Sequence, residues 1–206
     1  MFPKTISIST ALAGSVGGLL ALAVAATLFV GLGVGVRNTE DLIGEKALLV
    51  VEHIERNITD YLTPLEEQVE YLGRLTEAGL VELGWEEEVS RVLAASNAAL
   101  PQASVIAFFD TSFKATVVVR EPNRAPEVLS QDWSGFEPAR QAMDWARSSA
   151  DLRWTPPLFV EQAKETMLSV FKPVYVKGEL LGIYVATVDI VTLAGYLEDL
   201  SDTVHG

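Results

Sequence analysis

The stretch that decides the fold is KPVYVKGELLGIYVATVDIVTLAGYLEDL, residues 172–200. β-branched and aromatic residues lie on both sides of Lys177 and Gly178, which is typical of two strands joined by a tight turn. The residues that follow repeat their apolar positions at spacings of three and four, which predicts a helix. Asp189 lies where the second strand gives way to this helix. Its carboxylate either caps the helix or is available to a ligand cation.

The rest of the chain predicts an α+β domain built on one antiparallel sheet. Residues 103–110 and 114–121 form a second pair of β-branched and aromatic runs around a polar turn, which predicts another hairpin. Hairpins with helices before, between and after them are typical of α+β domains. The other predicted segments are a helix at 85–100, a loop at 121–135, a helix at 136–147 and a break at 155–158.

An apolar stripe ahead of this domain predicts a long helix over residues 37–80. Pro64 interrupts the stripe, and Thr63, Pro64 and Glu66 have the order of a helix restart, with a cap, a first-turn proline and a glutamate reaching back. We therefore expect a kink or a one-turn break there. The stripe consists of Ile43, Ala47, Val50, Val51, Ile54, Ile58, Tyr61, Leu62, Leu65, Val69 and Leu72.

Residues 10–36 have the length and composition of an uncleaved membrane anchor. No charged residue occurs from Thr5 to Val36, and about 20 apolar residues suffice to cross a bilayer. Lys4 weakly favours a cytoplasmic N-terminus, so we expect residues 37–206 outside the cytoplasm of a single-pass inner-membrane protein. The predicted divisions are a cytoplasmic N-terminus at 1–9, a transmembrane helix at 10–36, a juxtamembrane helix at 37–80, and the sheet with its terminal helix at 81–206.

Charge and composition exclude several kinds of function. The chain has 15 Lys and Arg against 28 Asp and Glu, a net charge of −13, which argues against a nucleic-acid partner. There is no cysteine, and neither His53 nor His205 is placed to activate a serine or to join a metal cluster. We expect no catalytic residue, no metal and no cofactor. The alternatives from other classes are an anchored periplasmic hydrolase and a scaffold protein.

Small residues inside the expected anchor favour a homodimer. Gly14 and Gly18, and again Gly31 and Gly35, are spaced one helical turn apart, which allows two membrane helices to approach closely. The apolar stripe of the following helix can continue such a pairing as a partial coiled coil.

These features together resemble the Cache family of extracytoplasmic sensor domains. The shared pattern is a membrane helix leading into a long helix, a strand pair, a Trp-x-Pro segment and a closing PVYxxGxLLGxxxxxVDI hairpin, over roughly residues 40–204. The resemblance implies a PAS-like sheet, a small-molecule pocket on one face, and a role in signal transduction. The matching residues are Trp154, Pro156, Pro173, Val174, Tyr175, Gly178, Leu181, Gly182 and Asp189.

The resemblance also suggests a role for Asp189. In the amino-acid-binding branch of the family an aspartate at the end of the last strand holds the ligand amine, and Asp189 occupies that place. That branch uses an R-x-W-Y cluster for the ligand carboxylate. The cluster is absent here, and its nearest analogue is LRW at residues 152–154.

Four further side chains are candidates for ligand contact. Arg153 either offers a fork to a carboxylate or is a solvated arginine. Trp154 beside it either stacks on a ligand or packs in the core. Trp133 and Tyr175 combine large apolar area with a polar group, so they either line a pocket or belong to the rim of the core.

Residues 36–75 followed by 101–110 resemble, more narrowly, the sensor region of bacterial membrane-bound class III adenylate or guanylate cyclases. Similar sensors occur on histidine kinases and chemoreceptors, so these outputs are the alternatives. We expect the chain to be the front part of a longer receptor that continues into a second membrane helix and a cytoplasmic output domain.

Overall fold

The computed structural model describes residues 8–120, 124–161 and 164–205. The chain forms two compact units, residues 1–53 and 54–206. The first contains the beginning of helix α1 (Ile8–Glu77). In the described ranges no helix is both long enough and apolar enough to cross a membrane. The membrane span expected at 10–36 stays a prediction, and residues 1–7 of the expected N-terminal segment lie outside the described residues.

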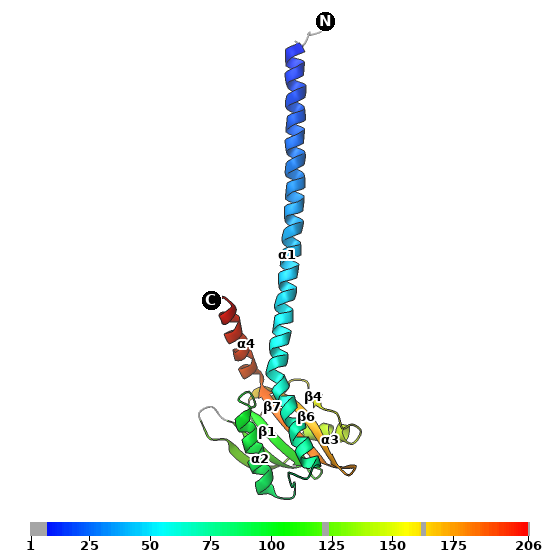
Figure 1. The fold of residues 1–206 in the computed structure, drawn as a ribbon, viewed down its shortest axis with the longest axis vertical. Helices are drawn as coiled ribbons and strands as arrows, with labels where there is room; N and C mark the ends of the chain where they lie inside the picture. The colour runs from blue at the N-terminus through cyan, green and yellow to red at the C-terminus, as the bar shows by residue number, and fades with distance from the viewer. Residues whose placement is uncertain (1–7, 121–123, 162–163, 206) are drawn as a thin grey trace. The chain divides into compact units, whose positions relative to one another are not determined.

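The second unit is built on one antiparallel sheet, which confirms the predicted α+β class (Figure 1). The described residues give seven strands in the order β3-β2-β1-β7-β6-β4, with β5 also paired to β6. The strands are β1 Val105–Asp110, β2 Lys114–Val119, β3 Glu127–Asp132, β4 Arg153–Trp154, β5 Leu158–Val160, β6 Glu165–Val176 and β7 Glu179–Asp189.

Both predicted hairpins are confirmed. β1 pairs with β2, and β6 pairs with β7 around a turn in which Lys177 and Gly178 have φ of 53° and 88°. Positive φ at both central residues is the geometry of the two-residue turns that match strand twist, and glycine adopts it without strain. The hairpins meet in the middle of the sheet, because β1 also pairs with β7.

Three strands of the structure were not predicted from the sequence. β3 falls within the predicted loop at 121–135 and pairs with β2 over all six of its residues. β4 ends just before the predicted break at 155–158, β5 begins at the last residue of that break, and both pair with β6. The loop prediction for β3 is wrong because this edge strand is largely exposed and lacks the apolar alternation that marks a half-buried strand.

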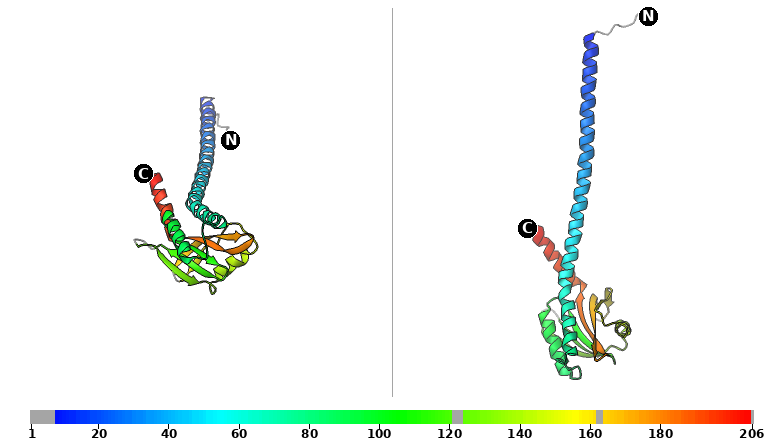
Figure 2. Two further views of the ribbon diagram at one scale, coloured as in Figure 1. Left: turned by 60° about the horizontal axis from the view of Figure 1, so that its bottom comes forward. Right: turned by 45° about the vertical axis from the view of Figure 1, so that its right-hand side comes forward.

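Apolar side chains on the two faces of the sheet form two cores. One face packs against α1 and α2 (Glu86–Ala99), around Leu65, Leu93 and Tyr184. The other face, which we call the α3 face, packs against α3 (Glu137–Ala146), around Phe109, Met143 and Ile183. The right-hand view of Figure 2 shows the sheet between these helices.

Helix α1 continues through Pro64, so the predicted restart at Thr63 is wrong. The Thr63 hydroxyl donates to the carbonyl oxygen of Thr59 at 2.8 Å and does not cap a new helix. Pro64 is followed by Leu65 and Val69, which are fully buried against the sheet. Their packing supplies tertiary support for a helix that a proline would otherwise weaken.

The N-terminal part of the predicted stripe is exposed in the single chain. Ile43, Val50 and Val51 are each more than half exposed, in contrast to Leu65 and Val69. The homodimer that this stripe was expected to support stays a prediction.

The predicted terminal helix is confirmed as α4 (Ile190–His205), which follows β7 directly. Leu193 of α4 packs against the core beneath α1 and α2. The rings of Tyr196 and Tyr61 lie 4.5 Å apart, so α4 also contacts the part of α1 that belongs to the second unit.

Candidate functional site

Polar side chains form one row on the α3 face of the sheet. Ile183 and Val185 of β7 pack beneath α3, and strand alternation places Thr187 on the same face. The hydroxyls of Thr187 and Ser169 are 2.9 Å apart. The Thr155 hydroxyl is 3.3 Å from both backbone polar groups of Ser169. Thr155, Ser169 and Thr187 therefore form a hydrogen-bonded row across β6, β7 and the residue after β4.

Asp189 caps α4. Its two carboxylate oxygens accept hydrogen bonds from the backbone N–H of Thr192 at 2.6 Å and from the Thr192 hydroxyl at 2.7 Å. A side-chain acceptor three residues before the N–H it binds is the geometry of a helix N-cap. The carboxylate is mostly buried and lies near Tyr61. Burial, and next the charge of Asp189, raise the pKa of the Tyr61 hydroxyl.

Two substitutions of Asp189 should distinguish its role as a helix cap from the effect of its negative charge. We expect Asp189→Ala to lower the free energy of unfolding by about 1 kcal/mol, because the first turn of α4 loses its cap. Asp189→Asn should cost much less, since asparagine is an equally good N-cap. Urea unfolding of residues 54–206 measures both. Equal losses for the two variants would show that the charge, not the cap, supports the fold.

Arg153 and Trp154 point to opposite faces of the sheet. The Arg153 guanidinium lies 5.7 Å from the ring centre of Trp145, on α3. The Trp154 indole N–H donates to Glu66 Oε1, on α1, and the indole packs against the core under α1 and α2. Adjacent residues of a strand alternate in this way. Trp154 therefore lies on the face opposite Arg153.

Tyr175 and Trp133 lie on the α3 face. The Tyr175 hydroxyl donates to the carbonyl oxygen of Ala146, at the end of α3. Trp133 packs against Phe109 and Phe136 with ring centres 5.4 and 5.9 Å apart. The structure thus brings Arg153, Tyr175 and Trp133 to one face of the sheet, along its contact with α3. Their expected role in ligand contact stays a prediction.

The polar row was missed in the sequence, although β7 contains a signal for it. Thr187 and Asp189 continue the alternating positions of Ile183 and Val185, so the character of this face changes from apolar to polar along one strand. Such a change in a buried strand marks a place where polar groups need partners. Ser169 and Thr155 become visible only through their pairing with β7 and β6.

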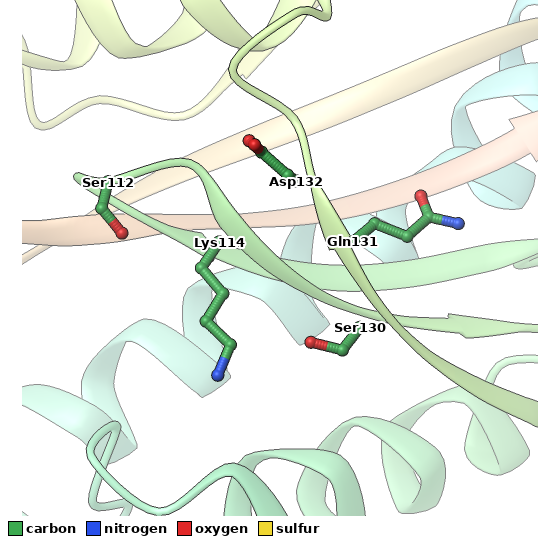
Figure 3. A pocket seen from close by; sticks show the side chains of 5 residues that line it. All are labelled: Ser112, Lys114, Ser130, Gln131 and Asp132. Atoms are coloured by element: carbon green, nitrogen blue, oxygen red, sulfur yellow. The ribbon is translucent and has the colours of Figure 1, made fainter.

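A separate open depression of about 390 Å³ lies by β2 and β3 and is lined by Ser112, Lys114, Ser130, Gln131 and Asp132 (Figure 3). The Lys114 ammonium is 2.7 Å from Glu86 of α2, and this contact lowers the pKa of the Glu86 carboxyl. Figure 3 shows Asp132 pointing away from Lys114 and Ser130. Within the described residues, no three His, Cys, Asp or Glu side chains are grouped as metal ligands.

Several solved structures share this fold. The sensory domain of the Campylobacter jejuni chemoreceptor Tlp3 superposes with a TM-score of 0.57 at 13% identity, covering 70% of this chain and 60% of that one. The ligand-binding domain of the Pseudomonas aeruginosa amino-acid chemoreceptor PctC gives 0.54 at 20% identity, covering 80% and 67%. The extracellular domain of vpHK1S-Z8, described as a histidine kinase, gives 0.58 at 17% identity, covering 73% and 59%.

The chain therefore shares the fold of these three domains. This confirms the expected sensor-type architecture at the level of the fold. The chain spans about 60% of the length of the Tlp3 domain. No protein-family model and no curated protein matches the sequence.

Proposed function

We propose that the chain is the extracytoplasmic ligand-binding domain of a membrane-anchored receptor and that it is not itself an enzyme. The observation that carries this proposal is the architecture of residues 54–206, which is similar to sensory domains of two chemoreceptors and to the extracellular domain of vpHK1S-Z8. The apolar, uncharged segment at 10–36 supports anchoring in the inner membrane.

The ligand is a small molecule with an anionic group, bound on the α3 face. Arg153 supports this assignment because its guanidinium is exposed and stacks over Trp145. A guanidinium offers parallel donors that match a carboxylate. Thr155, two residues after Arg153 in the chain, adds a hydroxyl on the same face. Structures of the Tlp3 and PctC domains are complexes with L-valine and GABA, which both carry a carboxylate.

Ligand-dependent stabilisation of the full chain in detergent tests the proposal. A panel of small carboxylates, amino acids and amines would be screened by thermal unfolding. A true ligand at roughly 100 times its Kd should stabilise the folded state by about 2.7 kcal/mol. We expect Arg153→Gln to remove this stabilisation, and Arg147→Gln, an exposed arginine of the same region, to preserve it. A carboxylate that stabilises the wild type and the Arg153→Gln variant equally would contradict the assignment.

Asp189 distinguishes a zwitterionic ligand from a purely anionic one. If Asp189 also holds the ligand amine, Asp189→Asn should weaken binding of amino acids while leaving the cap of α4 in place. Unchanged affinity would leave Asp189 with the capping role alone. Titration of the wild type and of the Asp189→Asn variant with the responding ligand gives the two Kd values to compare.

We propose that the output of the receptor is a nucleotide cyclase, because residues 36–75 and 101–110 resemble the sensor region of bacterial membrane-bound class III cyclases. A chemoreceptor or histidine kinase output has comparable support, because the similar solved structures belong to such proteins. The coding sequence beyond Gly206 decides among them. An in-frame second membrane helix followed by a cyclase domain is the expected result, and a kinase or methyl-accepting domain would replace the cyclase proposal.

A further inference from the structure

Strand β4 contacts both helical layers of the domain, although it consists of only Arg153 and Trp154. Arg153 faces α3 through the ring of Trp145, and Trp154 faces α1 through its hydrogen bond with Glu66. The two residues are adjacent in an edge strand, so their side chains share one short backbone segment and extend to opposite faces. β4 therefore connects the proposed ligand face with the helix that leads toward the N-terminus.

β4 contacts α1 through the hydrogen bond from the Trp154 indole N–H to the Glu66 carboxylate. Glu66 and Trp154 are 88 residues apart in the chain, and both side chains are half-buried. A hydrogen bond to a carboxylate is stronger than one between neutral groups and is screened less when it is removed from water. Rupture of this bond would leave a half-buried indole N–H or carboxylate oxygen without its partner, so the bond resists independent movement of β4 and α1.

β4 has the shortest ladder of the described strands, because only its two residues pair with β6. β4 pairs only with β6, through Arg153 opposite Phe171 and Trp154 opposite Val170, whereas β7 pairs along both of its edges. Regions with few buried contacts and short hydrogen-bonded ladders open at low free energy. Arg153 lies on the α3 face, and its guanidinium is exposed. It has no ion pair among the described residues, so it is available to an anionic ligand.

We propose that β4 is the coupling element of the sensor, and that Trp154 and Glu66 are the positioning residues through which a change at Arg153 reaches α1. The inference rests on the proposed function, because it assigns the direction of the signal to a ligand on the α3 face. A ligand shifts an equilibrium only where it contacts two states differently. Arg153 is that contact, and the Trp154–Glu66 bond differs between the two states.

Amide hydrogen exchange in α1 tests the coupling without any ligand. The full chain in detergent would be compared as wild type, Arg153→Gln, Trp154→Phe and the double variant, with exchange measured over residues 61–77. Arg153→Gln should change the rate of amide exchange near Glu66 by about fivefold. This factor is at the lower end of the usual range for coupling between two sites. In the Trp154→Phe background the same change should have less than about a twofold effect, because the indole N–H that connects β4 to α1 is gone.

Glu66 provides an independent version of the test if Trp154→Phe perturbs the fold. Glu66→Gln keeps an oxygen acceptor and should preserve the response of α1 to Arg153→Gln, while Glu66→Met keeps the length of the side chain and should abolish it. Arg147→Gln, on an exposed arginine paired with Asp144, should leave α1 unchanged. An equal response of α1 to Arg153→Gln with and without the bond overturns the proposal. So does the absence of any response in the wild-type background.

These outcomes are distinct from failure of the proposed function. The exchange experiment uses no ligand, so its result does not depend on whether the thermal screen finds one. A chain that binds a carboxylate through Arg153 but shows no coupling through Trp154 would keep the proposed function and lose this inference.

Discussion

Replacement of Gly182 by alanine is expected to lower the free energy of unfolding by about 3 kcal/mol, at the upper end of the usual cost of overpacking. A Cβ atom on Gly182 would lie 2.3 Å from the carbonyl oxygen of Phe109 and 2.5 Å from Cζ of Phe108. Gly182 is in β7, between β1 and β6, so neither neighbouring strand can move without disturbing its ladder. The Phe108 ring is itself held 4.9 Å from the ring of Tyr184.

Gly135→Ala is the matched control for this variant. Gly135 is exposed, and an added Cβ atom would meet no heavy atom within 4 Å. Urea unfolding of residues 54–206, the unit that contains both cores, measures the two variants side by side. Equal unfolding midpoints for Gly182→Ala and Gly135→Ala would mean that β1 and β7 are not packed as closely as described.

The sequence predicts the central strands well because their signal is local. β1, β2, β6 and β7 are at least partly buried, rich in β-branched and aromatic residues, and joined pairwise by short turns, so composition and spacing identify them. The edge strands lack this signal. β3 is mostly exposed and polar, and β4 has two residues, so both exist only because a neighbouring strand offers a ladder.

The candidate site likewise has one part that the sequence predicts and one part that it does not. The cap formed by Asp189 involves Thr192, three residues away, and a rule about strand-to-helix junctions anticipates it. The partner of Trp154 is Glu66, which no local rule identifies. Arg153 and Trp154 were each a candidate for ligand contact, with a solvated arginine and a core tryptophan as the alternatives, and their role in binding stays a prediction. Recognition of β4 as a strand would have placed them on opposite faces from alternation alone.

Replacement of Leu65 by alanine should cost about 3 kcal/mol, within the usual range for a truncated core leucine. Leu65 is fully buried where α1 packs against the sheet, and it follows Pro64 directly. Because a proline inside a helix removes one backbone hydrogen bond, this turn of α1 depends on tertiary packing, and the cavity should weaken it further.

Leu80→Ala provides the comparison, since Leu80 is 69% exposed and its truncation should change stability by less than about 0.5 kcal/mol. Urea unfolding of residues 54–206 gives both free energies, and hydrogen exchange should show faster opening of α1 near Pro64 only in Leu65→Ala. Similar stability losses for the two leucines would contradict the packing of α1 on the sheet. Such a result would also remove the support that lets Glu66, the next residue, hold Trp154 in place.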